Sequence, residues 1–150
     1  MKSGTWKTYT PNDGLAGLRL QHIAEDAAGF LWLATTTNGV SRFDGETFTT
    51  FTTRDGLSGN QVYVIEADQR GRLWFGCAGG VSWYDEQGFH RLAPDIWGVD
   101  STITHVSVEP TGRVWFAGFA TAESHRILIG YCDDDALQDL SGLYARDCFD

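Results

Sequence analysis

The sequence predicts an all-β protein: a β-propeller segment of about three blades, each a four-stranded antiparallel sheet. Two observations carry this prediction. The 150 residues include 18 glycines, nine phenylalanines, six tryptophans and five tyrosines, which indicates short strands joined by tight turns. A glycine followed three residues later by a tryptophan also recurs about every 40 residues, the period of a propeller blade. The three copies are Gly29 and Trp32, Gly71 and Trp74, and Gly112 and Trp115.

Each repeat divides into four expected strands, and the second repeat shows them most clearly. Its strands, from innermost to outermost, are QVYVIEAD (61–68), RLWFGC (72–77), GVSWYD (80–85) and QGFHRL (87–92). The last two strands have counterparts in the first repeat, GVSRFD (39–44) and ETFTTF (46–51). Within a single domain spanning 1–150, we therefore expect blades at about 18–53, 60–93 and 102–140.

An acidic residue stands three positions before each repeated glycine, as Asp26, Asp68 and Glu109. An acid at the first position of a tight turn can accept hydrogen bonds from backbone amides, and glycine adopts the left-handed conformation that ends the turn. The tryptophan in the next strand is then the large side chain that packs between neighbouring blades. We interpret the repeated glycines and tryptophans as structural residues.

The start of the chain carries a further strand signal. TWKTYT (5–10) matches the outer strands of the repeats, with Trp6 aligned to Phe48 and Tyr9 to Phe51. The chain therefore begins with an outer strand that has no blade of its own, and in propellers such a strand commonly pairs into the last blade. The stretch 136–150 is then expected to form either the third blade's own outer strand or a short helix.

Three blades do not close a ring, because propellers use about four to eight. The first and third blades would expose apolar faces meant for neighbours, and such faces mark an association surface. Two explanations stay open. Either two chains join as a six-bladed ring, with or without exchange of outer strands, or the chain is a fragment of a longer propeller.

Charge and hydropathy exclude several classes of partner. The net charge of −9 argues against nucleic acid, whose binding proteins present basic patches. No apolar run approaches the roughly 20 residues that span a membrane. The start MKSGTWKTYT lacks the apolar core of a signal peptide. The acidic tail at 133–150 is interpreted as a solvated end, with calcium binding as the alternative.

Cysteine and glycine patterns indicate no cofactor. The three cysteines, Cys77, Cys132 and Cys148, are spaced as neither a disulfide framework nor a zinc site. GCAGG (76–80) is rich in glycine, but it joins two strands and lacks the helix and lysine of a phosphate loop.

DGLSGNQVYVIEADQRGRLWFGCAGGVSWYDEQGF (55–89) resembles the two-component regulator propeller repeat, and the resemblance extends over about 5–92. It implies a binding or sensing propeller in an extracytoplasmic, periplasmic setting, with carbohydrate fragments as a common class of signal. PTGRVWFAGFATAESHRILIGYC (110–132) also resembles blades of virginiamycin B lyase-like proteins. Those are metal-dependent lyases with a histidine general base, and the resemblance assigns no catalytic residue in this chain.

Candidate site residues follow from the expected loops. Propeller ligands bind where loops converge over the channel mouth, and we expect the links from outer to inner strand and from second to third strand on that face. Trp97 breaks the repeat in one of these links. Its ring can stack on a sugar or a peptide, or it can cover the edge of the third blade. The ligand-binding candidates are Arg54, Asp55, Asn60, Trp97, Asp100, Glu123 and His125.

Two histidines, His22 and His105, share one position on the inner strands of the first and third repeats. Side chains at this position can face the central channel and bind a ligand or a metal, or they can pack between blades with one hydrogen bond. Because no acid/base cluster is recognisable, we predict a non-catalytic module that binds a ligand or a partner. The alternatives are a metal-dependent lyase-like enzyme and a scaffold for protein–protein interaction.

Overall fold

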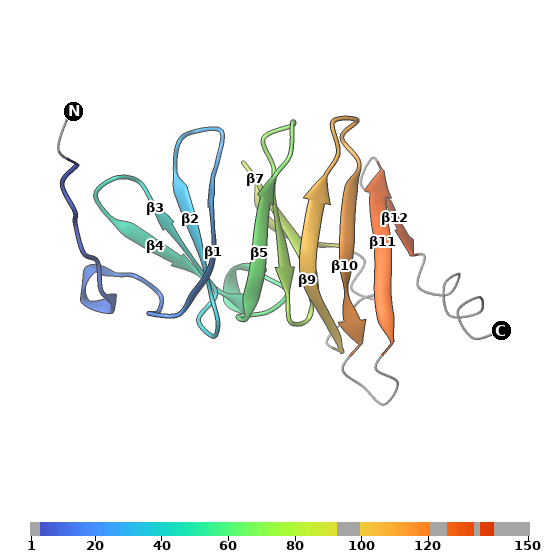
Figure 1. Ribbon diagram of the computed structural model, residues 1–150, viewed down its shortest axis with the longest axis horizontal. Helices are drawn as coiled ribbons and strands as arrows, with labels where there is room; N and C mark the ends of the chain where they lie inside the picture. The colour runs from blue at the N-terminus through green and yellow to red at the C-terminus, as the bar shows by residue number, and fades with distance from the viewer. Residues whose placement is uncertain (1–3, 93–99, 121–125, 134–135, 140–150) are drawn as a thin grey trace.

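The strands of the chain form three four-stranded antiparallel sheets that stand side by side (Figure 1). A computed structural model describes residues 4–92, 100–120, 126–133 and 136–139. In each sheet the strands follow their order in the sequence, and the inner strands β1, β5 and β9 lie next to one another. The predicted all-β class and the division into three blades are confirmed.

Each blade is built from four consecutive strands of the chain. The first blade contains β1 (Leu20–Glu25), β2 (Leu31–Thr35), β3 (Val40–Phe43) and β4 (Phe48–Phe51). The second contains β5 (Val62–Ala67), β6 (Leu73–Cys77), β7 (Gly80–Asp85) and β8 (Gly88–Leu92). The third contains β9 (Ser101–Val108), β10 (Val114–Ala120), β11 (Ile127–Asp133) and β12 (Ala136–Asp139). Two short 3-10 helices lead into the first two blades, η1 (Pro11–Asp13) and η2 (Thr53–Asp55). No helix in the described ranges is long and apolar enough to cross a lipid bilayer.

The sequence allows an outer strand near each end of the chain, and the structure has one only near the C-terminal end of the described residues. The outer strand expected at 5–10 is not formed. An outer strand is held by hydrogen bonds to the third strand of its blade, and among the described residues no such strand lies beside this segment. The stretch from 136 begins with a strand, because β12 pairs with β11 and completes the third blade.

The repeated acid, glycine and tryptophan form one structural unit at the first turn of each blade. Asp26 Oδ1 accepts hydrogen bonds from the amides of Ala28 (2.9 Å) and Phe30 (3.0 Å). Its other oxygen, Oδ2, accepts one from Trp32 Nε1 (2.8 Å). Gly29 has a φ of +86°, which the turn requires and which residues with a Cβ rarely adopt. One carboxylate therefore holds both the turn and the indole.

The same unit recurs in the other two blades. Trp74 Nε1 donates to Asp68 Oδ2 (2.9 Å), and Trp115 Nε1 donates to Glu109 Oε1 (2.6 Å). Asp68 also accepts two bonds from Arg72, at 2.9 Å from the amide and 2.7 Å from Nε. Burial by itself would raise the pKa of Asp68, but these donated hydrogen bonds outweigh it and hold the pKa below its ordinary value.

Two apolar cores fill the spaces between the sheets. In the first, the Trp32 ring lies 4.9 Å from that of Tyr84 and 5.7 Å from that of Phe75. In the second, Trp74 lies 5.6 Å from Phe116. Trp32 and Trp74 are completely buried, and removing such an aromatic side chain typically costs about 3–5 kcal/mol. Two of the three tryptophans that the sequence pattern repeats, Trp32 and Trp74, therefore belong to the cores between the blades.

Replacing Asp68 with asparagine tests the contribution of this carboxylate. The variant loses a charge, and its amide cannot accept all the bonds that Asp68 accepts. We expect the free energy of unfolding at neutral pH to fall by about 1–3 kcal/mol, measured by urea denaturation with tryptophan fluorescence. Glu86→Gln removes the same charge from an exposed turn residue and should leave stability nearly unchanged. Equal stability of the two variants would contradict this role.

The acid dependence of stability follows from the direction of the Asp68 shift. Its pKa is lower in the folded chain than in the unfolded chain, so Asp68 stabilises the fold fully above about pH 4. This contribution is lost as pH falls from about 4 through the lower, folded-state pKa. We expect urea denaturation between pH 6 and pH 3 to show a smaller loss of stability for Asp68→Asn than for Glu86→Gln. Identical pH profiles would contradict the prediction.

Candidate functional site

The links from second to third strand and from outer to inner strand lie at one end of the blade stack, which we call the loop end (bottom of Figure 1). Backbone hydrogen bonds join links of different blades: Gly39 N donates to Asn60 O (2.7 Å), and Gly79 N donates to Ser101 O (2.6 Å). The links from outer to inner strand and from second to third strand thus lie together, as expected. The opposite end carries the acid–tryptophan turns, and we call it the turn end.

Three of the four described loop candidates lie in the link between the first and second blades. Asp55 Oδ2 accepts from the Thr52 amide (2.8 Å), and Asn60 Oδ1 accepts from the Thr53 amide (2.8 Å). Both side chains therefore shape the link around η2. Arg54, the middle residue of η2, is exposed.

The fourth described candidate, Asp100, is exposed where the chain enters β9, one blade further along the loop end. The structure therefore brings Arg54, Asp55 and Asn60 together and places Asp100 in the next link. Trp97, Glu123 and His125 lie outside the described residues.

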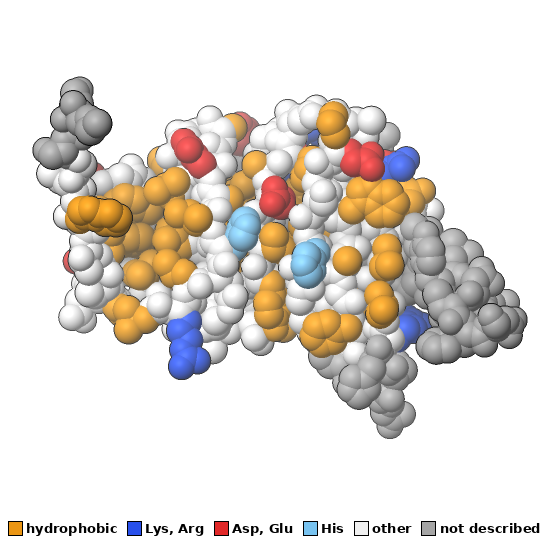
Figure 2. Space-filling view, in the orientation of Figure 1, with side chains coloured by type: hydrophobic (Ala, Val, Ile, Leu, Met, Phe, Trp, Pro, Cys, Tyr) orange, Lys and Arg blue, Asp and Glu red, His pale blue; other side chains and the backbone are white. Residues whose placement is uncertain are grey.

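His22 and His105 occupy equivalent positions on β1 and β9. Each inner strand has a register shift just before this position, and Figure 2 shows histidine side chains on the face formed by the inner strands. His22 Nδ1 accepts a long hydrogen bond from the Ile65 amide (3.4 Å), and His105 Nδ1 lies 2.8 Å from Thr104 Oγ1. Among the described residues no three His, Cys, Asp or Glu side chains gather as metal ligands.

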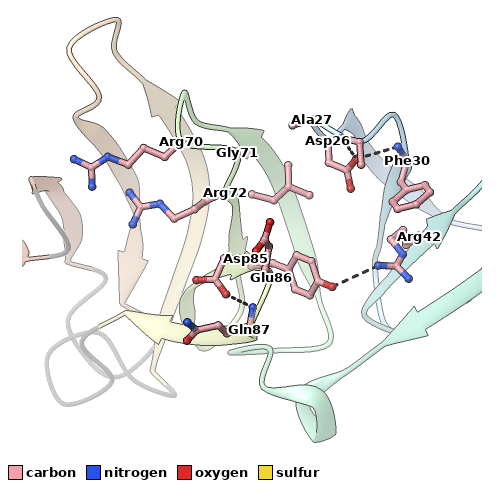
Figure 3. A pocket seen from close by; sticks show the side chains of 13 residues that line it. Asp26, Ala27, Phe30, Arg42, Arg70, Gly71, Arg72, Asp85, Glu86 and Gln87 are labelled. Carbon is pink, nitrogen blue, oxygen red and sulfur yellow. Dashed lines mark hydrogen bonds between the residues drawn. The ribbon is translucent and has the colours of Figure 1, made fainter.

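A groove that the sequence did not indicate lies at the turn end, between the first and second blades (Figure 3). Its volume is about 740 Å³, and it is open to solvent. The first blade contributes Asp26, Phe30 and Arg42 to one wall, and Tyr84 and Asp85 stand on the other. The groove combines aromatic surface with both signs of charge, a lining suited to a polar ligand.

Arg42 determines the form of this groove. Its guanidinium lies 5.1 Å from the Phe30 ring and donates from Nη1 to the Tyr84 hydroxyl at 3.4 Å. The equivalent residue of the second blade is Trp83, opposite Trp74 as Arg42 is opposite Trp32. In the sequence, the only mark of this difference is that Arg42 stands in GVSRFD where Trp83 stands in GVSWYD.

Asp85 closes the other wall. Burial by itself would raise its pKa, but hydrogen bonds from His90 Nε2 (3.0 Å) and the Gln87 amide (2.8 Å) lower it below the ordinary value. The carboxylate is thus kept charged and in place by its own blade.

Part of the second blade matches the model of a known repeat family. Residues 56–79, which run from the η2 link through β6, match the model of the two component regulator propeller. The second blade resembles that family. This confirms the resemblance seen in the sequence. Comparison with curated proteins finds no match.

Solved structures share the fold. Two extracellular domains of putative hybrid two component systems from B. thetaiotaomicron are 16% and 18% identical, with TM-scores of 0.66 and 0.65. They cover 91% and 80% of this chain, which covers 24% and 18% of theirs. Virginiamycin B lyase from Staphylococcus aureus is 19% identical, with a TM-score of 0.57 over 83% of this chain and 42% of the lyase. The chain therefore spans less than half of each of these propeller structures, and at such identities the likeness shows the fold alone.

The loop end depends on close approach at Gly59. A Cβ at this position would overlap the carbonyl oxygen of Ala78 in the neighbouring link. We expect Gly59→Ala to lower the free energy of unfolding by about 1–3 kcal/mol because the two links must separate. Urea denaturation measures the loss. Gly4→Ala, where a Cβ would meet no atom within 4 Å, is the matched control, and equal stability of the two variants would contradict the close packing.

Proposed function

We propose that the chain is a non-catalytic recognition module, a propeller segment whose exposed blade faces bind further blades. One contrast between equivalent residues supports this. Ile23 on β1 is 58% exposed, whereas its counterparts Ile65 and Val106 are 0% and 7% exposed. Those two counterparts are buried against the preceding blade of the stack. Ile23 has the same position, and within the described part of the chain no blade stands in front of it. Leu20, 46% exposed, shows the same contrast.

The apolar surface around Ile23 is large enough to favour association. Figure 2 shows hydrophobic side chains gathered over the end of the first blade. Burying a single side chain of this size contributes about 1.5–3 kcal/mol. Contiguous apolar surface of this kind on a soluble domain is typical of an interaction site.

The loop end would bind the ligand. Arg54 is exposed there, on a link whose shape Asp55 and Asn60 hold by backbone bonds. A small molecule or a carbohydrate would be bound by this face. The likeness to extracellular domains of two component systems supports a sensing role and an extracytoplasmic location.

Association is tested first by light scattering on a size-exclusion column across a range of concentrations. We expect the wild-type chain to form species larger than its 16.6 kDa mass. Ile23→Glu should abolish these species, because a carboxylate buried in the interface without a partner is costly. Ile23 is exposed in the single chain, so the variant should keep its fold, checked by circular dichroism.

Gln21→Glu is the control for charge. Gln21 is exposed on the same strand, and its substitution adds the same negative charge two residues away. It should associate like the wild type. A wild-type chain that is monomeric at every concentration, or an Ile23→Glu variant that associates normally, would overturn the proposal.

A further inference from the structure

The N-terminal segment occupies the place of an outer strand that belongs to a preceding blade. The Tyr9 ring lies 5.0 Å from Phe43 and 5.2 Å from Phe48, both on the first blade. One blade further on, Phe51 of β4 lies 6.0 Å from Tyr84 and 5.4 Å from Phe89, the equivalent pair. Tyr9 therefore stands before the first blade as Phe51 stands before the second.

The turn that follows the segment repeats the same match. Asp13 Oδ2 accepts from the Thr10 amide (2.7 Å), as Asp55 Oδ2 does from the Thr52 amide (2.8 Å). Further along, the Ala16 amide donates to Ser41 Oγ (2.8 Å). The Ser58 amide makes the same bond to Ser82 Oγ (2.8 Å). The chain from Tyr9 to Ala16 is thus positioned as a blade-to-blade link.

Trp6 shows what this segment lacks. Its equivalent, Phe48, stacks on Phe43 of the adjacent strand with ring centroids 4.5 Å apart. Side chains three positions apart on a strand point to opposite faces, so if residues 5–10 formed a strand Trp6 would point away from the blade that Tyr9 contacts. Trp6 is fully exposed. Among the described residues, no third strand lies beside residues 5–10.

We propose that a second copy of this chain supplies that strand, as β11 of its third blade. Residues 5–10 would displace β12, which pairs with β11 in the single chain, and take its place. This inference rests on the proposed function and names its partner. The third blade presents the complementary face, because Trp115 is partly exposed whereas Trp32 and Trp74 are completely buried. Each third blade would meet the other copy's first blade, which closes a ring of six blades, within the range that propellers use.

The register of the exchanged strand follows from the blades that are complete. In the first blade Phe43 lies opposite Leu31 on β2 and opposite Phe48 on β4. In the third blade Cys132 has the position of Phe43, opposite Val114 on β10. Trp6, the equivalent of Phe48, should therefore lie directly opposite Cys132 of the partner. Opposed residues on antiparallel strands have Cα atoms about 4.5–5.5 Å apart, which a disulfide can bridge.

Within one chain this bond cannot form. The N-terminal segment lies beyond the first blade and β11 lies in the third, at opposite ends of the stack (Figure 1). A disulfide between position 6 and Cys132 therefore reports contact between two copies.

The test is the substitution Trp6→Cys, oxidised mildly with copper phenanthroline and run on a non-reducing gel. Trp6 is exposed, so the change should not disturb the single chain. We expect most of the protein to move to twice the chain mass, and we expect this band to be lost when Cys132→Ser is added. Lys7→Cys is the matched control, because Lys7 is equivalent to Thr49 and would face Tyr131 instead of Cys132.

Light scattering of the same proteins under reducing conditions separates the two proposals. Association without the disulfide between positions 6 and 132 would overturn the exchanged strand and leave the recognition module standing. A monomer at all concentrations, without the disulfide, would overturn both. An equally strong band from Lys7→Cys would also overturn the exchange, because it would show random contact and not this register.

Discussion

The structure depends on the hydrogen bond from each repeated tryptophan to the acid six residues before it. A carboxylate that accepts backbone amides and an indole N–H fixes the turn and orients a large ring in the same step. The rings of Trp32 and Trp74 then lie between two sheets, where they need no further polar partner. The turn and the packing between blades are thus coupled through one side chain. A substitution that disrupts the turn would also change the position of the tryptophan ring in the core.

This coupling explains why the fold was predictable. Each contact between acid, glycine and tryptophan spans at most six residues, so it leaves a regular mark in the sequence. The outer strand at 5–10 was predicted for the same reason, since its aromatic residues match those of β4. It is not formed because a strand also needs a neighbour, and a repeat pattern does not say whether that neighbour is present.

The candidate site was less predictable, for a physical reason. Asp55 and Asn60 have the residue types expected of ligand-binding groups, but in this structure they accept hydrogen bonds from backbone amides of their own link. A polar loop residue looks the same in a sequence in either role. The turn-end groove could not be predicted from the sequence, because it depends on a contact between Arg42 of the first blade and Tyr84 of the second, 42 positions apart. The roles of Trp97, Glu123 and His125 stay predictions.

The link between blades has a consequence for how such a chain can change its length. Gly39 N bonds to Asn60 O and Gly79 N bonds to Ser101 O, so each blade is fastened to the entry of the next. The segment that repeats in structure therefore runs from one link to the following link. Its outer strand contributes an aromatic side chain that contacts the next blade, as Phe51 contacts Tyr84 and Phe89. Duplicating or deleting that segment in a gene would add or remove one whole blade together with its link. Propellers with different numbers of blades can arise in this way.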